Sequence, residues 1–346
     1  MSVEPILEVS GLRIQFKTPQ GIAEVVNGVD LSIAPGQVHG LVGESGSGKS
    51  VTARAVLGIL PRNVLHLQEG SVRFAGQEIL GMGEDLMRKR IRGRRIAMVF
   101  QDPMTALNPV MRIGKQLVLP MRRHLGLSAK DAGARAIDLL AQVGIPDPEE
   151  KFKAYPHQLS GGQRQRVMIA LALSCDPELL IADEPTTALD VTVQAQILDL
   201  FDTLRRERNL AVLLVSHDLS LIAERCDDVS VMYAGRVVET GSAISTFEAP
   251  QHPYTKALEK ARPRLDNPPH TLLQTIPGRP PQLTDLPHGC SFAGRCPRVT
   301  ELCLEVDPPL AVGPAGRPVA CHHPVAGPDE PLEGAWAIDS SERTPR

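Results

Sequence analysis

The fold of this chain is decided by one stretch, Gly43-Glu44-Ser45-Gly46-Ser47-Gly48-Lys49-Ser50. It follows a short apolar run, 38–42, and it precedes a stretch of helical character, 51–60. The glycines let several backbone N–H groups converge on one anion, and the following helix adds the positive end of its dipole. We therefore predict a phosphate-binding loop in which Lys49 reaches the β- and γ-phosphates and the Ser50 hydroxyl holds Mg²⁺. The alternative, a glycine-rich turn that binds nothing, accounts poorly for the length and context of the motif.

Composition and charge narrow the class of protein. With 346 residues, the chain has room for one large domain and a smaller one. The net charge of −3 gives no electrostatic reason to expect nucleic-acid binding. No apolar run approaches the roughly 18–20 residues that cross a bilayer, and the N-terminus, with Glu4 and Glu8, lacks a signal-peptide pattern. We expect a cytosolic protein that reaches a membrane only through a partner.

The N-terminal residues predict an antiparallel hairpin. Apolar and polar residues alternate over 7–16, and a second strand is expected near 23–33 after a turn at 18–21. Phe16 ends the first strand, and the residues alone leave two interpretations open. It is either a core residue or a platform on which the adenine of a nucleotide stacks.

The region after the loop mixes strands with a helical insert. The basic run 88–95 is interpreted as a solvated helix face or loop because the overall balance is acidic, with a nucleic-acid patch as the alternative. The apolar run 96–100 predicts a buried strand and ends at Gln101, where α/β sheets place ligand contacts. An ordinary turn glutamine explains Gln101 equally well. From 113 to 153 the apolar spacing is helical, which predicts an insert between two segments of the sheet.

A second candidate anion site begins at Ser160. This serine is a good N-cap for the helix that runs through Val167 to Ser174. The adjacent Gly161 and Gly162 suggest that the backbone approaches a ligand closely. A second anion-binding helix N-terminus therefore competes with the simpler interpretation, a capped helix alone.

Two carboxylates and a histidine follow buried strands. The apolar stretch 179–183 ends in Asp183 and Glu184. Asp183 is expected to hold the Mg²⁺ shell through water, and Glu184 to orient or deprotonate an attacking water; a solvated acid pair in a turn is the alternative. The next apolar stretch, 210–216, ends at His217, which could reach the same crevice, although a lone histidine is more often structural.

The amino-acid composition of the chain changes near its C-terminal end. A helix opens at 188–190, and the sheet is expected to close with 229–233 and 236–240. Of the 30 prolines, 18 lie from Pro250 onward, which predicts a loop-rich appendage and a tail from 328.

Four of the six cysteines, namely Cys290, Cys296, Cys303 and Cys321, lie in this appendage. Their spacing is Cys-x5-Cys-x6-Cys-x17-Cys. It fits neither the Cys-x2-Cys pairs of zinc sites nor the common ferredoxin run. On spacing alone, free thiols and a metal site therefore both remain open.

Taken in order, these features resemble the ATP-binding cassette (ABC) ATPase subunits, over about residues 5 to 260. The matching segments are the phosphate loop 43–50, the Q-loop glutamine Gln101, the LSGGQ signature Leu159–Gln163, the second nucleotide motif Leu179–Glu184, the D-loop Ala188–Asp190 and the switch histidine His217.

The resemblance implies a role for each matching residue. Glu184 is implied to be the general base and His217 the sensor of the γ-phosphate, with Gln101 as a further catalytic residue. The implied Mg²⁺ ligands are Ser50, Gln101 and Asp183. Nucleotide contacts are implied at Phe16, Gly43, Glu44, Ser45, Gly46, Ser47, Gly48, Lys49, Ser50 and Val51, and, toward the nucleotide of a second cassette, at Ser160, Gly161, Gly162, Gln163 and Asp190. Val51 stands where many cassettes carry a threonine, which leaves one side-chain contact with the α-phosphate in question.

Three segments narrow the resemblance to the dipeptide/oligopeptide importer branch, which also includes nickel importers. They are Phe100-Gln101-Asp102-Pro103-Met104-Thr105-Ala106-Leu107-Asn108-Pro109, the stretch 252–258, and the cysteine-bearing stretch that starts at Gly289. The branch resemblance favours a [4Fe-4S] cluster held by the four C-terminal cysteines. Zinc, with His322 or His323 as a further ligand, is the second choice.

The predicted fold class is α/β: a P-loop NTPase of the ABC type, with a mixed sheet core, an antiparallel β subdomain, a helical signature subdomain, and a small Cys/Pro-rich C-terminal appendage. The expected domains are the cassette, 1–260, an oligopeptide-importer-type C-terminal domain, 261–327, and a tail, 328–346.

The expected function is that of an ATP-hydrolysing subunit of an ABC importer, for di- or oligopeptides, that uses ATP and Mg²⁺ at a pair of cassettes. The implied partners are a second, paralogous cassette, two transmembrane permease subunits and an extracytoplasmic solute-binding protein, at the cytoplasmic face of the inner or plasma membrane. The alternatives are a nickel or other small-solute importer, a soluble ABC protein without a transport role, and a degenerate cassette that only binds ATP. The single cassette without a heptad run disfavours the second, and the intact Glu184, His217 and Ser160 disfavour the third.

Overall fold

The alternating N-terminal residues form an antiparallel sheet. The structure, a computed structural model, describes residues 4–102, 106–185, 191–262 and 275–325, together with 327 and 330. In spatial order the strands of this sheet are β2 (Gly21–Ile33), β1 (Leu7–Thr18), β4 (Leu65–Phe74) and β5 (Gln77–Glu78). Thr18 pairs with Gly21 and Leu7 with Ile33, which confirms the predicted hairpin.

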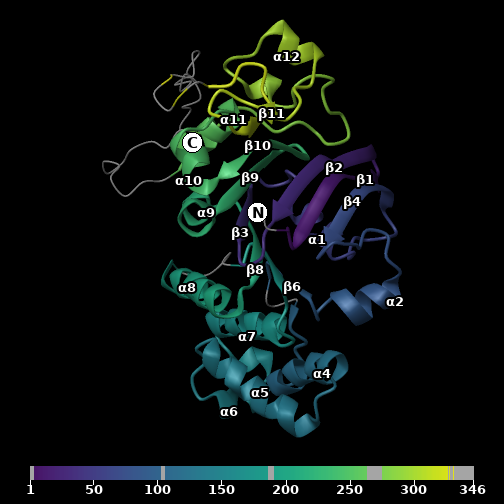
Figure 1. The fold of residues 1–346 in the computed structure, drawn as a ribbon, viewed down its shortest axis with the longest axis vertical. Coiled ribbons are helices and arrows are strands. Elements are labelled where there is room, and N and C mark those ends of the chain that lie inside the picture. The colour runs from purple at the N-terminus through teal and green to yellow at the C-terminus, as the bar shows by residue number, and fades with distance from the viewer. Residues whose placement is uncertain are drawn as a thin grey trace, which may run out of the picture.

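The main sheet sets the position of the site. Within the described residues its order is β11–β12–β10–β9–β3–β8–β7–β6 (Figure 1). These strands are β3 (Val38–Val42), β6 (Ile96–Val99), β7 (Leu179–Asp183), β8 (Ala211–Ser216), β9 (Asp228–Tyr233), β10 (Arg236–Ser242), β11 (Ala311–Val312) and β12 (Pro318–Val319). The pairs β3–β9, β3–β8, β8–β7 and β7–β6 are all parallel. Because the carboxyl ends of parallel strands meet at one edge, the residues that follow β3, β6, β7 and β8 converge there.

Both faces of the main sheet are buried, as its continuous apolar strands predict. In β6, Ala97 and Val99 enter one apolar cluster, and Ile96 and Met98 enter another. The first cluster also contains most of the buried residues of the helices, and the second contains those of α1 (Lys49–Val56) and of the antiparallel sheet. The two sheets are therefore joined by an apolar core with α1 between them.

The predicted helical insert over 113–153 is confirmed. It forms α4 (Ile113–Leu125), α5 (Ala129–Gln142) and α6 (Pro148–Lys153), followed by α7 (Gly161–Leu173). Figure 1 places α4, α5 and α6 at the end of the molecule opposite α12. The other α-helices in the described part of the chain are α2 (Glu84–Leu86), α8 (Val191–Arg208), α9 (Leu219–Arg225), α10 (Ala243–Glu248), α11 (Pro253–Lys260) and α12 (Glu301–Glu305). In that same part, none of the helices has the length and apolar character needed to cross a bilayer.

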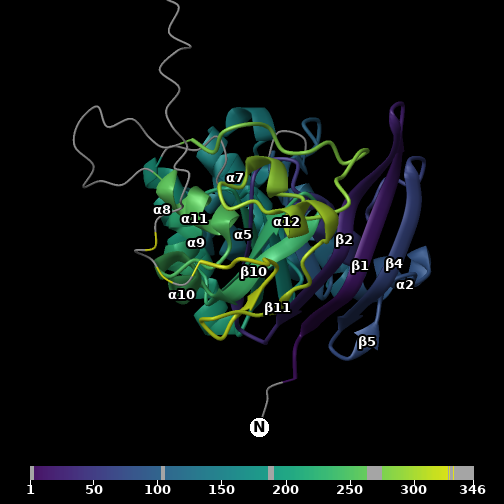
Figure 2. The ribbon, with the colours of Figure 1, turned by 90° about the horizontal axis from the view of Figure 1, so that it is seen from above.

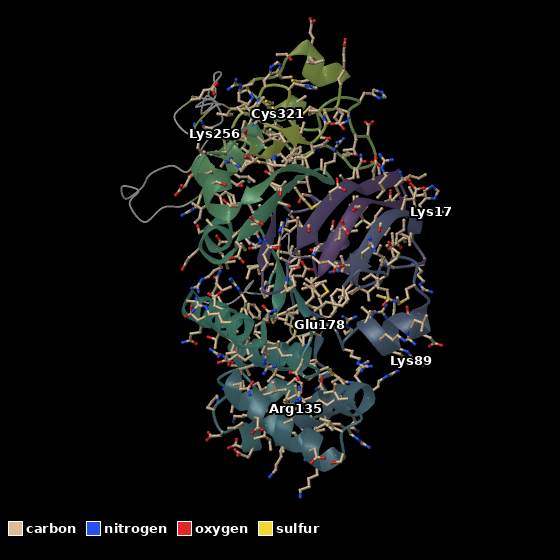
Figure 3. All side chains as sticks on the ribbon, viewed as in Figure 1. Lys17, Lys89, Arg135, Glu178, Lys256 and Cys321 are labelled. Carbon is tan, nitrogen blue, oxygen red and sulfur yellow. The ribbon has the colours of Figure 1, made fainter. Side chains whose placement is uncertain are left out.

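The first part of the basic run, 88–90, is a solvated helical face, as expected, whereas Arg92 and Arg95 are partly buried. Residues Met87–Ile91 form a π-helical turn directly after α2. Met87 and Ile91 are buried while the basic residues between them are exposed. Lys89, labelled in Figure 3, lies on the outer side of the molecule.

Residues 275–325, called here the C-terminal segment, extend the main sheet. Glu239 of β10 pairs with Val319 of β12, and Ala311 of β11 pairs with Val319. The buried Glu239 carboxylate accepts hydrogen bonds from the backbone N–H groups of Gln251 and His252, both at 2.9 Å. Seen from above in Figure 2, β11 and α12 lie over β10. The segment is thus joined to the sheet through strand pairing and not only through side chains.

Candidate functional site

The phosphate loop, residues 43–50, connects β3 to α1 at the carboxyl edge of the main sheet. Gly43 has φ +151°, and a Cβ at this position would lie 2.1 Å from the carbonyl oxygen of Met232. Gly48 has φ +101°, and a Cβ there would lie 2.4 Å from the carbonyl oxygen of Val25. Any side chain at either position would meet backbone atoms in a conformation that L-residues rarely adopt. The glycine requirement inferred from the motif therefore has a direct steric cause.

Lys49 is folded back onto its own loop. Its side chain is buried, and Nζ donates to the carbonyl oxygens of Gly43, at 2.7 Å, and Glu44, at 2.9 Å. Burial lowers the pKa of Lys49, while the negative charges of Glu184, Asp183 and Glu44 oppose that shift. The ammonium group thus lies among the carboxylates of the site, where a bound polyphosphate would also attract it.

Lys49 is the first residue of α1, so the N-terminus of this helix faces the loop. The N–H groups of a first helical turn have no partner within the helix, and the helix dipole favours an anion beside them. Val51 is partly buried and packs against the apolar core. It has no hydroxyl to offer, which agrees with the departure noted in the sequence.

Ser50 and Asp183 are brought into contact by the sheet. The Ser50 hydroxyl donates to Asp183 Oδ1 at 2.7 Å, and Asp183 is fully buried. Among the described residues no donor bonds to Asp183 Oδ2, although a guanidinium nitrogen of Arg54 lies 3.8 Å away. Burial raises the pKa of Asp183, against the lowering effects of Ser50 and Arg54. A buried carboxylate oxygen without a hydrogen bond, beside a serine hydroxyl, fits the oxygen donor set of Mg²⁺.

Glu184 is held between the two other predicted catalytic side chains. Gln101 Nε2 donates to Glu184 Oε2 at 2.9 Å, and His217 Nδ1 lies 3.2 Å from Glu184 Oε1. The backbone of Glu184 has φ +48°, a left-handed conformation that costs a non-glycine residue about 1–3 kcal/mol. Its N–H donates to Val215 O at 2.9 Å, which ties this bend to β8. The structure brings Gln101, Glu184 and His217 together, and their catalytic roles stay predictions.

The signature residues lie at the start of α7. Ser160 is its N-cap: the Ser160 hydroxyl accepts from the N–H of Gln163 at 3.2 Å, and Gln163 Oε1 accepts from the N–H of Ser160 at 3.1 Å. This capping box confirms the expected cap. Gly161 and Gly162 form the first turn, and a Cβ on Gly161 would meet no atom within 4 Å. Ser160 and Gly161 are exposed among the described residues.

Two of the predicted nucleotide contacts, at Phe16 and Asp190, stay predictions. Phe16 is partly buried and packs against the apolar cluster that contains α1, so a core role is present and the adenine contact stays a prediction. Asp190, with the rest of 186–190, lies outside the described residues, as do 103–105 of the stretch that follows Gln101.

Sequence reasoning missed two contacts with the phosphate loop. The N–H of Glu44 donates to the Tyr254 hydroxyl at 2.8 Å, and the Glu44 carboxylate forms a two-pronged ion pair with Arg295. These partners lie 210 and 251 residues further along the chain. In the sequence, both partners lie in stretches that show only a family resemblance, namely 252–258 and the cysteine stretch. No local pattern there indicates a contact with the phosphate loop.

The four C-terminal cysteines line one small cavity, together with His252, Phe292, His322 and His323. All four thiols are free, and burial raises the pKa of Cys296 to about 11 and that of Cys321 to about 12. Over the described residues, no three Cys, His, Asp or Glu side chains are grouped so that they could hold a metal ion. The imidazoles bond elsewhere: His322 Nε2 lies 2.9 Å from Val306 O, and His323 Nε2 lies 2.9 Å from the Thr300 hydroxyl.

One edge of the sheet presents a glycine loop, a helix N-terminus and a lysine for phosphate oxygens. Beside it are a serine–aspartate pair for a divalent cation and a carboxylate that could take a proton from water. This combination is suited to hydrolysis of a nucleoside triphosphate.

Two family models match the chain. A model described as "ABC transporter" matches residues 26–187, and one described as "Oligopeptide/dipeptide transporter, C-terminal region" matches residues 238–303.

Curated relatives match over nearly the full length. The oligopeptide transport ATP-binding protein OppD of Escherichia coli (strain K12) is 49% identical over 322 residues, which cover 93% of this chain and 94% of the relative. The dipeptide transport ATP-binding protein DppD of Bacillus subtilis (strain 168) is 45% identical, over 92% of this chain and 95% of the relative. A solved dimeric ATP-binding cassette, in a post-hydrolysis state with ADP and phosphate, superposes with a TM-score of 0.61 at 27% identity; the match covers 68% of this chain and 98% of that one.

Proposed function

This chain belongs to the ABC transporter family as an ATP-hydrolysing subunit, and from that premise we propose that it powers the import of di- or oligopeptides. The observation that carries the cargo class is the similarity to oligopeptide and dipeptide transport ATP-binding proteins over more than nine-tenths of the chain. A nickel or other small solute is the runner-up, because the same branch includes such importers.

We propose that ATP binds with its phosphates in the glycine loop. The backbone N–H groups of the loop and of the first turn of α1 would surround the β-phosphate. Lys49 would then exchange its two carbonyl partners for phosphate oxygens, a gain because an ammonium bonds more strongly to an anion than to a neutral carbonyl. Phe16 is the proposed partner of the adenine ring.

Ser50, Asp183 and Gln101 are the proposed ligands and near neighbours of Mg²⁺. The Asp183 oxygen without a hydrogen bond and the adjacent Ser50 hydroxyl support this assignment. When bound, Mg²⁺ neutralises charge on the β- and γ-phosphate oxygens. Ser50 would offer its hydroxyl oxygen to the cation, and Asp183 would hold the cation's shell through water.

Glu184 is the proposed general base. As a water molecule attacks the γ-phosphorus, Glu184 takes one proton from it, and the bond from the γ-phosphorus to the β–γ bridging oxygen breaks to leave ADP and inorganic phosphate. His217 would contact the γ-phosphate and hold Glu184 in orientation through their present contact. Gln101 donates to the other Glu184 oxygen in this structure, and it would be a further ligand of the cation.

A second cassette is the proposed partner across the nucleotide. Ser160, Gly161, Gly162 and Gln163 would contact the ATP held by that cassette, and Asp190 would lie near the same junction. The exposed Ser160 and Gly161 at the start of α7 and the dimeric form of the similar solved cassette support this arrangement. Following the branch resemblance, we propose that the partner cassette is a paralogue.

The chain acts as a peripheral subunit of a membrane transporter. We propose that it docks on two permease subunits at the cytoplasmic face of the inner or plasma membrane, and that an extracytoplasmic binding protein selects the cargo. An apolar groove between the main sheet and the helical insert, lined by Phe100, Met98, Pro120 and Met168 among others, supports a docked permease segment. Phe100 is exposed there, although it is aromatic.

The decisive test replaces the proposed base. Glu184→Gln keeps the size of the side chain but cannot accept a proton, so ATP hydrolysis and peptide uptake by the assembled transporter should fall at least about 100-fold. Equilibrium binding of Mg-ATP to the purified chain should stay within about twofold of wild type, because the phosphate loop is untouched.

Glu178→Gln is the matched control. Glu178, labelled in Figure 3, lies just before β7, at the end of that strand away from the site, and it pairs with Arg95. It should leave turnover unchanged. Unchanged hydrolysis in Glu184→Gln would reject the assignment of Glu184 as the general base. Nickel uptake without peptide uptake by the wild-type transporter would reject peptides as the cargo in favour of nickel.

We further propose the domain division 1–260, 261–327 and a tail 328–346, with a [4Fe-4S] cluster in the middle part. The four thiols that line one cavity support it. Cys290, Cys296, Cys303 and Cys321 would hold it, and such a crosslink would stabilise a proline-rich segment that has few apolar residues.

Metal content tests the cluster directly. Protein purified without oxygen should be brown and contain about four irons per chain, and Cys303→Ser should lose the colour. Stoichiometric zinc without iron would select zinc, and a protein with neither metal would leave the cysteines as free thiols.

A further inference from the structure

The phosphate loop is held from outside the cassette by a residue of the C-terminal segment. Arg295 Nη1 donates to Glu44 Oε2 at 2.7 Å, and Nη2 donates to Glu44 Oε1 at 3.0 Å. The Arg295 side chain is only 5% exposed, against 27% for Glu44. A buried two-pronged pair between arginine and carboxylate fixes orientation as well as charge.

Every N–H group of the Arg295 guanidinium donates a hydrogen bond. Its Nε donates to Pro277 O at 2.9 Å, Nη2 also donates to Ile276 O at 3.2 Å, and Nη1 also donates to the Tyr233 hydroxyl at 3.3 Å. With the two bonds to Glu44, all five N–H groups of the guanidinium have an acceptor. The guanidinium is therefore in a fixed position and not a mobile surface charge.

Glu44 is fixed through its main chain as well. Its N–H donates to the hydroxyl of Tyr254, which is fully buried and packs against Tyr233 and Phe292. Its carbonyl oxygen accepts from Lys49 Nζ and from the N–H of Ser47, at 3.2 Å. Glu44 is thus the point where the bend of the phosphate loop is anchored to the rest of the molecule.

The charge of Glu44 matters for the ligand. An unpaired carboxylate in a phosphate loop repels the triphosphate and competes with it for Lys49. Arg295 cancels that charge through its two bonds to the carboxylate.

We propose that Arg295 is a positioning residue of the nucleotide site, and that the C-terminal segment sets the affinity for the triphosphate through the Arg295–Glu44 pair. The inference rests on the proposed nucleotide site, and it assigns to the C-terminal segment a part in ATP binding that the cassette motifs do not contain. Arg295 lies in the turn between Cys290 and Cys296.

The test measures Mg-ATP binding to the full chain at equilibrium and steady-state hydrolysis in the assembled transporter. Arg295→Ala should raise the dissociation constant and KM for ATP about tenfold, the usual weight of a charge-assisted buried pair, with kcat within about twofold of wild type. Arg295→Lys keeps the positive charge but loses one of the two bonds to Glu44, so its dissociation constant for ATP should lie between those of wild type and Arg295→Ala. It also keeps the test valid if the alanine variant folds poorly.

A second substitution separates positioning from general damage. If Arg295 acts through Glu44, adding Glu44→Ala to Arg295→Ala removes the carboxylate that the first substitution leaves unpaired, so ATP affinity should fall no further and should recover part of the loss. Arg298→Ala is the control, since Arg298 lies in the same segment and pairs with Glu330 instead. It should leave ATP affinity unchanged.

The outcomes are distinct. If wild type binds ATP and Arg295→Ala binds it equally well, the inference is wrong and the proposed function stands. Equal loss in Arg298→Ala, or additive losses in the double variant, would also overturn it. If wild type does not bind ATP, the proposed nucleotide site itself fails.

Discussion

His39 is a buried histidine that the proposed hydrolysis does not use. It lies in β3 with 4% of its surface exposed, and Nε2 is 3.0 Å from the Ser230 hydroxyl. Within the described residues its Nδ1 has no hydrogen-bond partner. Burial lowers the pKa of His39 to about 4. The folded protein therefore keeps this imidazole neutral where an unfolded chain would protonate it.

That difference gives stability a defined pH dependence. Between about pH 6.5 and pH 4 the unfolded state binds a proton at His39 that the folded state does not, so stability falls as the pH falls. The loss from pH 7 to pH 5 attributable to this residue is about 2 kcal/mol. His39→Gln should remove that part of the slope, as measured by urea unfolding at both pH values.

His157, which is exposed, supplies the control: His157→Gln should leave the slope unchanged. Some slope should remain in His39→Gln, because burial also lowers the pKa of His252, to about 3. Parallel pH profiles for wild type and His39→Gln would show that His39 is not held neutral by burial.

At the level of single residues, sequence reasoning works where a side chain belongs to a local motif. Lys49, Asp183 and Glu184 lie where the strand–loop–helix pattern and the strand ends predict them. Tyr254 and Arg295 could not be predicted, because their contact with Glu44 depends on how distant segments fold against the loop. No local sequence pattern indicates a contact between two residues that lie so far apart in the chain.

Among the elements, α7 combines a structural and a proposed functional role in one residue. Ser160 caps the helix, and the same hydroxyl is proposed to face the nucleotide of a second cassette. The two roles have different chemical requirements, because an N-cap tolerates a carboxylate whereas a triphosphate is repelled by one.

Ser160→Asp separates these roles. Aspartate caps as well as serine, so the free energy of unfolding should stay within about 0.5 kcal/mol of wild type. Hydrolysis by the paired cassettes should fall at least about tenfold, because a negative charge would face the bound triphosphate. Thermal or urea unfolding of the chain and ATPase activity of the assembled transporter measure the two effects.

Ser128→Ala is the converse control. Ser128 caps α5 by accepting from the N–H of Asp131 at 3.2 Å, in a helix without a proposed nucleotide contact. It should cost about 1 kcal/mol of stability and leave hydrolysis unchanged. Normal activity in Ser160→Asp would place the second nucleotide contact elsewhere.

Elements were predicted well in type and less well at their ends. The helix predicted over 51–60 is α1, which begins at Lys49 inside the loop motif and ends at Val56. The π-helical turn over Met87–Ile91 was not predicted, because its buried residues are four apart, as in an ordinary helix. Apolar periodicity reports which face is buried and says little about how the backbone hydrogen bonds close.

In the whole molecule, the order of the main sheet follows from principles that the sequence already invokes. Alternating strands and helices predict parallel strands with their carboxyl ends at one edge, and β3, β8, β7 and β6 are arranged in that way. The position of the C-terminal segment does not follow in the same way. Proline-rich composition predicts loops, and the two short strands that continue the sheet depend on pairing with a β10 more than 60 residues earlier in the chain.

The junction between β12 and β10 has a consequence for how the chain can be divided. A chain cut near residue 261 would leave β10 as an uncovered border with apolar Val237 and Val238 and free backbone N–H and C=O groups. Such a border is a template for self-association. The C-terminal segment therefore also protects this exposed sheet edge from aggregation. A shortened cassette made for crystallisation would precipitate unless the edge were covered in another way.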